Sequence, residues 1–423
     1  MPVYELILHI LLFLVGLALF SSTIWAVIAS MLVPRPTHAR VLSISYELSS
    51  RLFRAIAIRR TSFRRRDVVL AASGPASILI QLLVFIIALL LALAMMLFAV
   101  SGLGTDDSLY QAGATLLTLG IVEPVNFAQV VLTIIAAFTG LVVIAILVGY
   151  LLTLGNAYTQ RESAINKLSL IAGEPAWGPE IMCRWALLSD GEPQEFRFDD
   201  WIDWASDVRM TQSANPILNQ YRSGSSRRNW VISCLAILDA AALGISTVRG
   251  VSVTSGAIRW LAEGSQTLAV LRHHELQTGV LRRTETIARD VRPTQDVWPN
   301  ATAKERAVVD AITRDSQRSG WRSAKDEAAI GVGLSRSEWD HGCDIMRRAG
   351  IELVDDLDVA WQQFSEMRRV YAGSAISLAQ SIYAVRAPWS GTRLPETPTV
   401  WPALAVDSLP TPGTVDPSTS ADG

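Results

Sequence analysis

The sequence predicts an all-α membrane protein with three transmembrane helices and a helical cytoplasmic domain. Half of its 423 residues are hydrophobic, and many of these gather in three windows. Leu6–Val33, Val68–Thr105 and Pro124–Gln160 contain no Asp, Glu, Lys or Arg. A helix of about 20 apolar residues crosses a bilayer, so each window is long enough to span it.

The charges between these windows predict the orientation. Residues 34–67 hold nine arginines, whereas residues 104–126 hold no Lys or Arg and three acidic residues. The positive-inside rule places the arginine-rich loop in the cytoplasm and the acidic loop outside. We therefore expect a multi-pass protein of the cell membrane, with its N-terminus outside and the chain after about Thr159 in the cytoplasm.

The first transmembrane helix is expected within residues 1–34. It lacks the basic n-region and the small-residue cleavage site of a signal peptide, and it exceeds the ~7–15 apolar residues of an h-region. We interpret it as a retained helix that stops at Pro34-Arg-Pro36. Glu5 and His9 lie near its outer end, where polar side chains reach the interface.

Residues 35–67 form a basic linker. Val41, Ile44 and Leu48 recur at helical spacing, which predicts an amphipathic helix. On the inner leaflet each arginine gains about 1 kcal/mol from anionic lipid. A linker helix packed on the cytoplasmic domain is the alternative. The arginines expected to face lipid are Arg51, Arg54, Arg59 and Arg60.

Residues 68–156 are expected to form a two-helix module, with helices over 76–102 and 126–156 and a polar insert at 108–124. Ser73-Gly74-Pro75 marks the start of the first helix, because proline is favoured in a first helical turn. Both helices are long enough to cross the membrane, so the insert must turn round on one membrane face.

The polar insert has an ordered set of residues. It carries Thr115, Thr118, Gly120 and Glu123 in the order T-x-x-T-x-G-x-x-E, and the amphipathic run Leu109–Leu117 that overlaps its start predicts a short helix. This order resembles the pore loop of potassium-channel-like proteins, whose filter reads T-x-x-T-x-G-[YF]-G-[DE]. The resemblance covers roughly residues 76–156. An ordinary external loop between two helices is the alternative.

The resemblance implies an ion pathway along the insert. In that family a threonine hydroxyl and a run of carbonyls replace the hydration shell of the ion, and glycine lets the carbonyls point inward. Thr115 then braces the loop, and Glu123 rings the outer mouth and attracts cations. The implied pathway residues are Thr115, Thr118, Leu119, Gly120, Ile121, Val122 and Glu123.

Two residues depart from the family pattern. Ile121 and Val122 stand where the family has an aromatic residue and its second glycine, so potassium selectivity is not implied. One chain supplies one loop, so the resemblance implies a homotetramer in the lipid bilayer that conducts monovalent cations and is regulated by its cytoplasmic domain. A non-conducting scaffold or sensor with a degenerate pore loop is the alternative that Ile121 and Val122 favour.

The third helix contains Gly140, Gly149 and Gly155. Glycine in a membrane helix most often allows close packing. Gly140 also lies about where the inner helices of channels that resemble this module bend, so it is a possible hinge.

A helical domain is expected over 157–386. The third helix should continue past Tyr158 to Gly173, and Ser335-x-x-Glu338 and Thr302-x-x-Glu305 fit the capping box at a helix start. Residues 359–383 predict one long closing helix. Residues 387–423 are rich in Pro, Ser, Thr and Gly, which predicts a disordered tail.

Residues 230–248 are apolar and nearly long enough to cross the membrane. Asp239 in their middle would cost about 2.5–3.5 kcal/mol on insertion scales, so we expect a buried helix of the cytoplasmic domain. Most of the 13 tryptophans follow the third window and are expected in the core of that domain.

Several functions are disfavoured. The chain after residue 155 has 28 basic and 33 acidic residues, which argues against binding to nucleic acid. Cys183, Cys234 and Cys343 are far apart, so they predict neither a disulfide framework nor a metal site. No catalytic or nucleotide-binding motif occurs, and we expect no enzyme activity, cofactor or metal.

Overall fold

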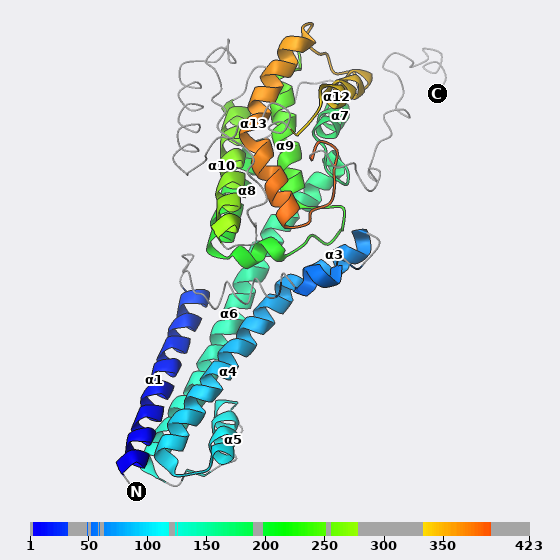
Figure 1. Ribbon diagram of the computed structural model, residues 1–423. Helices are drawn as coiled ribbons and strands as arrows, with labels where there is room; N and C mark the ends of the chain where they lie inside the picture. The colour runs from blue at the N-terminus through cyan, green and yellow to red at the C-terminus, as the bar shows by residue number, and fades with distance from the viewer. Residues whose placement is uncertain are drawn as a thin grey trace, which may run out of the picture. The chain divides into compact units, whose positions relative to one another are not determined.

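The computed structural model describes residues 3–32, 49, 52–57, 59, 63–117, 123–124, 126–188, 198–250, 255–277 and 333–390. The chain divides into two compact units. The first unit comprises Met1–Arg59 and Val69–Tyr158, and the second comprises Arg60–Val68 and Thr159–Gly423. Within the described residues the named elements are helical, and Val248 and Leu353 form an isolated β-bridge (Figure 1).

The first unit contains the long apolar helices. They are α1 (Val3–Met31), α4 (Ser73–Ser101) and the first part of α6 (Phe127–Ala172), with the short α5 (Thr105–Leu116) between α4 and α6 in the chain. Three described helices, counting α3 and α4 as one run, are long and apolar enough to cross a membrane. The prediction of an all-α chain with three such helices is confirmed.

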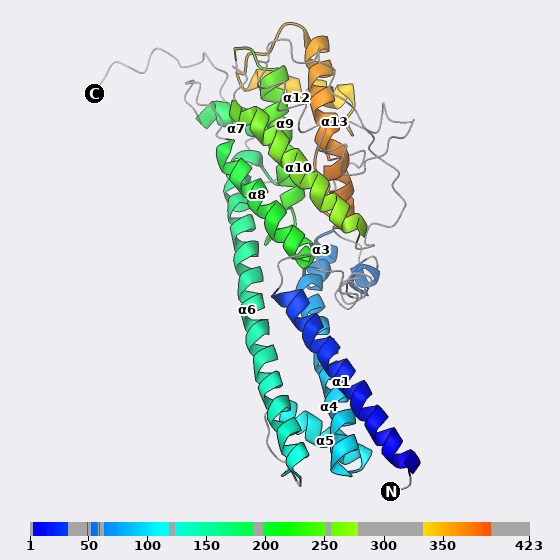
Figure 2. The same ribbon diagram turned by 90° about the vertical axis from the view of Figure 1, so that its left-hand side faces the viewer.

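The helices of the first unit pack along α4 through apolar side chains and a close approach at a glycine. Its core joins Leu89 and Leu93 of α4 to Leu132 and Ala136 of α6. α1 lies beside α4 (Figure 2), and a Cβ added at Gly16 would stand 2.9 Å from the carbonyl oxygen of Ala92. The outward faces of these helices carry exposed apolar side chains. Such faces suit contact with lipid.

The second unit is a helical bundle. Its helices are α3 (Phe63–Ala71), of which residues up to Val68 belong here, the last part of α6, α7 (Gly178–Leu188), α8 (Asp199–Ala214), η1 (Pro216–Gln220), α9 (Trp230–Ser246), α10 (Ser255–Gln277), α12 (Arg336–Arg348) and α13 (Leu357–Ser381). α9 packs against α7, α10 and α13, and α8 covers α10.

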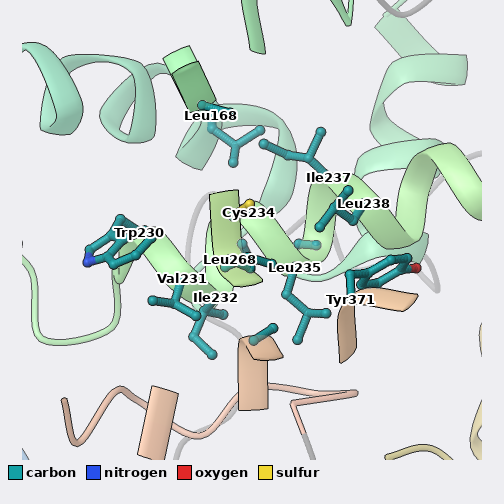
Figure 3. Close-up of a cluster of buried hydrophobic side chains, with 14 of the residues drawn as sticks. Leu168, Trp230, Val231, Ile232, Cys234, Leu235, Ile237, Leu238, Leu268 and Tyr371 are labelled. Atoms are coloured by element: carbon teal, nitrogen blue, oxygen red, sulfur yellow. The ribbon is translucent and has the colours of Figure 1, made fainter. Parts of the chain in front are cut away.

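α9 is the central helix of this bundle. Figure 3 shows its apolar side chains together with Leu168, Leu268 and Tyr371, which come from three other helices. Trp230, Ile237 and the residues between them are all buried. A helix that is apolar on every side is stable in water only inside a core. The prediction of a buried helix at residues 230–248 is confirmed.

Local signals at helix ends match the structure. Ser335 and Glu338 form the capping box of α12, and Thr302 lies outside the described residues. α6 continues as predicted to Ala172, and Gly173 follows it at φ 71°, a left-handed conformation that glycine adopts without strain. The long closing helix is present as α13.

The start of the predicted tail is different. We assigned residues 387–423 to it, but Trp389 is only 4% exposed, and Ser390 Oγ accepts a hydrogen bond from the amide of Ala387 at 2.9 Å. The indole of Trp389 packs edge-on against Trp177 and Phe364, which explains why this turn is held. Residues 391–423 lie outside the described part of the chain.

Tryptophan fills much of the core of the second unit. Trp204, Trp230, Trp260, Trp339 and Trp389 are buried, as predicted for the core. Trp298, Trp321 and Trp401 lie outside the described residues.

Candidate functional site

The short helix α5 packs one face against the apolar helices of the first unit. Its buried residues are Ser108, Gln111, Ala112, Ala114, Thr115 and Leu116, which recur mainly at helical spacing. Leu109 and Tyr110 on other faces are exposed. Asp106 and Asp107 lie in its first turn, where carboxylates complement the positive end of the helix dipole. The helix that the amphipathic run predicted is therefore present and lies beside α4 in both views (Figure 1, Figure 2).

The carboxyl end of α5 meets α6 at Gly140. A Cβ added at Gly140 would stand 2.0 Å from the carbonyl oxygen of Leu116, so no other residue fits without a backbone shift. At 1.5 Å per residue this contact lies roughly 20 Å along α6 from Phe127. The last carbonyls of α5 therefore lie beside the interior of α6 and not beside its first turn.

Gly140 thus has a packing role in the structure. α6 is one uninterrupted helix from Phe127 to Ala172, and Gly140 is buried within it. Gly149 and Gly155 are exposed, and a Cβ at either would meet nothing within 4 Å. Of the two interpretations of Gly140, close packing is the one with a contact to support it.

A chain of hydrogen bonds ties α4, α5 and α6 together. The Nδ2 of Asn126 donates to the carbonyl of Val100 at 3.1 Å, and the amide of Gln129 donates to Oδ1 of Asn126 at 2.8 Å. The Nε2 of Gln129 then donates to Oε1 of Gln111 at 2.7 Å. Gln111 and Gln129 are each 0% exposed. Sequence reasoning missed these residues, although two amide side chains in or beside otherwise apolar stretches were a usable signal.

The expected pathway residues are only partly described. Thr115 is 5% exposed on the buried face of α5, and Glu123 is exposed. Thr118, Leu119, Gly120, Ile121 and Val122 lie outside the described residues.

The expected lipid-facing arginines are also only partly described. Arg54 lies in a helical stretch and is half-buried, Arg59 is exposed, and Arg51 and Arg60 lie outside the described residues. The end of the predicted linker belongs to the second unit, where Phe63 packs on the apolar core.

The second unit holds a buried charge network that we did not predict as such. Arg368 forms an ion pair with Asp239, and the hydroxyl of Tyr371 donates to Asp239 Oδ1 at 2.8 Å. Arg368 also donates to the carbonyl of Trp389. Burial raises the pKa of Asp239, while Arg368 and Tyr371 act against that rise. Because each charge has a partner in the core, the network is suited to holding α9 and α13 together.

Metal and thiol chemistry find little support in the described part of the chain. It contains no group of three or more His, Cys, Asp or Glu that could hold a metal ion. Cys183, Cys234 and Cys343 are free and buried.

Comparisons with protein-family models, curated proteins and solved structures gave no match for this chain.

Proposed function

We propose that this chain is the subunit of a homotetrameric cation channel in the cell membrane, with the segment after α5 lining the ion pathway. The second unit lies in the cytoplasm and regulates opening. The observation that carries the proposal is the position of α5. Two neighbouring antiparallel helices need only a short connection, usually 2–8 residues, yet here a 12-residue helix with a buried polar face fills part of it.

The end of α5 supports cation binding in the segment that follows it. A helix carries roughly half a negative charge at its carboxyl end. Here the carboxyl end of α5 lies at Leu116, beside Gly140, which is about 20 Å along α6 from Phe127. The electric field of this helix end therefore acts within the apolar region of the bundle. A cation on the pathway after Leu116 is stabilised by this field, whereas an ordinary external loop needs no such placement.

The connection back to α6 is long enough to form a pathway. Extended at about 3.3 Å per residue, the chain from Leu116 to Phe127 reaches roughly 36 Å, more than the distance of ~20 Å that it must cover. We propose that backbone carbonyls of this return replace water around the ion, which is the chemistry of a filter. One such segment cannot enclose a path, and the resemblance to potassium-channel-like proteins implies that four chains meet to do so.

Orientation follows from the arginine asymmetry. The positive-inside rule places the acidic loop around Asp106, Asp107 and Glu123 outside, where exposed carboxylates concentrate cations at the pathway entrance. The same rule places the second unit in the cytoplasm.

Recordings from purified protein in planar bilayers test the proposal. We expect monovalent cation currents with weak discrimination, because Val122 resists the positive φ that glycine accepts. Glu123→Gln should lower the conductance at low salt and much less at high salt, where charges are screened. Glu5→Gln, the same change in α1, should not. The absence of current from folded tetramers would sink the proposal.

The second candidate function is a non-conducting scaffold or sensor, which Ile121 and Val122 favour. Ile121→Tyr with Val122→Gly restores the residue types of the family pattern and should raise potassium over sodium permeability in a conducting protein. If both the wild type and this variant stay silent as tetramers, the scaffold remains.

A further inference from the structure

A short helix such as α5 needs tertiary contacts to hold its position. Isolated helices of about 12 residues are marginally stable in water, and α5 has no side-chain hydrogen bond at its N-cap. Its apolar contacts, such as those of Ala112 and Leu116 in the core shared with α4 and α6, are non-directional and do not by themselves select one register. The close approach of Leu116 to Gly140 limits how near the two backbones lie, and a directional contact adds a fixed register.

The carboxamides of Gln111 and Gln129 supply that contact. Both side chains are fully buried, and the bond between them is 2.7 Å long. The nitrogen of the same carboxamide, Gln111 Nε2, has no hydrogen-bond partner among the residues that the structure describes. Gln129 is itself oriented through its backbone amide by Asn126, which is bonded to the end of α4. This chain of hydrogen bonds thus fixes the position of α5 relative to both flanking helices.

We propose that the Gln111–Gln129 hydrogen bond is the positioning contact that sets the depth of α5 between α4 and α6. Since Thr115 and the end of α5 lie one turn beyond Gln111, this bond also sets where the ion pathway begins. That second consequence rests on the proposed function, whereas the first does not.

Hydrogen exchange on the full chain in lipid nanodiscs tests the positioning contact. Gln129→Met keeps the length of the side chain and removes its donor, so backbone amides of Thr105–Leu116 should exchange at least ~10-fold faster. Gln81→Met is the matched control, since Gln81 is buried in α4 of the same unit and lies outside the chain of bonds. Unchanged exchange in Gln129→Met would overturn the proposal, whether or not the protein conducts.

The double variant separates positioning from plain stabilisation. Gln111→Met with Gln129→Met leaves no unpaired carboxamide at this place, so protection of α5 should largely return. Without the directional bond the permeability ratio of two monovalent cations should still change by about twofold or more. If the double variant has the wild-type permeability ratio, the hydrogen bond stabilises α5 but does not set where the ion pathway begins. If the wild type itself passes no current, the proposed function fails, and the exchange of Gln129→Met alone decides the positioning contact.

Discussion

The buried charge of Asp239, together with a length of 17 residues, distinguishes α9 from the membrane-length helices. α9 is otherwise apolar or carries small side chains, and among the described residues it is the one shorter apolar helix beside the three membrane-length ones. Asp239 is bound by Arg368 and Tyr371 of α13, which fixes the helix inside the second unit. The sequence indicated the cost of this charge in a membrane, but it could not show the partners, which are 129 and 132 positions away.

Removing one partner should show the cost of an unpaired buried charge. Arg368→Met should lower the free energy of unfolding of the second unit by about 3–5 kcal/mol. Replacing both charges, with Asp239→Leu and Arg368→Met, should recover much of that loss. Urea unfolding of the full chain, monitored by tryptophan fluorescence, measures this free energy of unfolding. Arg336→Met is the control, because Arg336 pairs at the surface and should cost about 1 kcal/mol or less.

At the scale of elements, the features that depend on residues close together in the sequence were predictable. Apolar length gave the three long helices, and the capping box at Ser335 gave the start of α12. Contacts between distant residues were not predictable, because one sequence does not show which residues pair. The Gln111–Gln129 bond is one case. Another is Arg222, which donates to Asp67 of α3 across 155 positions and to the carbonyl of Ile382 at 2.6 Å.

The contact of α5 with α6 makes a prediction about Gly140. Gly140→Ala should destabilise the first unit by about 1–3 kcal/mol and loosen α5, because the added methyl meets the backbone at Leu116. Gly149→Ala is the matched control in the same helix, where the added methyl meets nothing. Thermal unfolding in detergent with hydrogen exchange of α5 compares the two. Equal behaviour of the two variants would remove the close-packing role.

The loop that contains α5 should be external. Asp107→Cys is expected to react with a membrane-impermeant maleimide on intact cells, whereas Asp355→Cys, at a position whose side chain is 92% exposed in the second unit, should react only after lysis. Reaction of position 355 but not of position 107 on intact cells would reverse the orientation.

The native cysteines should not interfere with this labelling. Burial raises the pKa of Cys183 and of Cys343 to about 12, and it raises the pKa of Cys234 as well. The thiolate is the reactive form, so below these pKa values the thiols stay protonated and inert at neutral pH. Labelling of the folded wild type at pH 7 should be absent and should appear at all three residues after denaturation.

At the scale of the whole molecule, the exposed apolar side chains indicate what surrounds the first unit. Trp25 of α1 is 69% exposed and Phe138 of α6 is 67% exposed, and many neighbours resemble them. Such surfaces mark contacts with a membrane or with other protein chains. The proposed channel requires both, since four copies must meet around one path and present their outer faces to lipid.

Native mass spectrometry should therefore find a tetramer. Protein released from mild detergent or nanodiscs is expected to give the mass of four chains, and Gly140→Ala, by loosening α5, should lower the tetramer fraction relative to Gly149→Ala. A monomer or dimer that persists in nanodiscs would contradict the channel and leave the scaffold.

The bond between Asp67 and Arg222 also sets an order of assembly during synthesis. Asp67 leaves the ribosome before α4, α5 and α6, and Arg222 follows 155 residues later, which at ~5–20 residues per second is a delay of roughly 8 to 30 seconds. The carbonyl of Ile382, which Arg222 also binds, comes later still. The bonds of Arg222 to Asp67 and Ile382 can thus form only after the apolar helices have been made, so these helices leave the ribosome before the second unit can be completed.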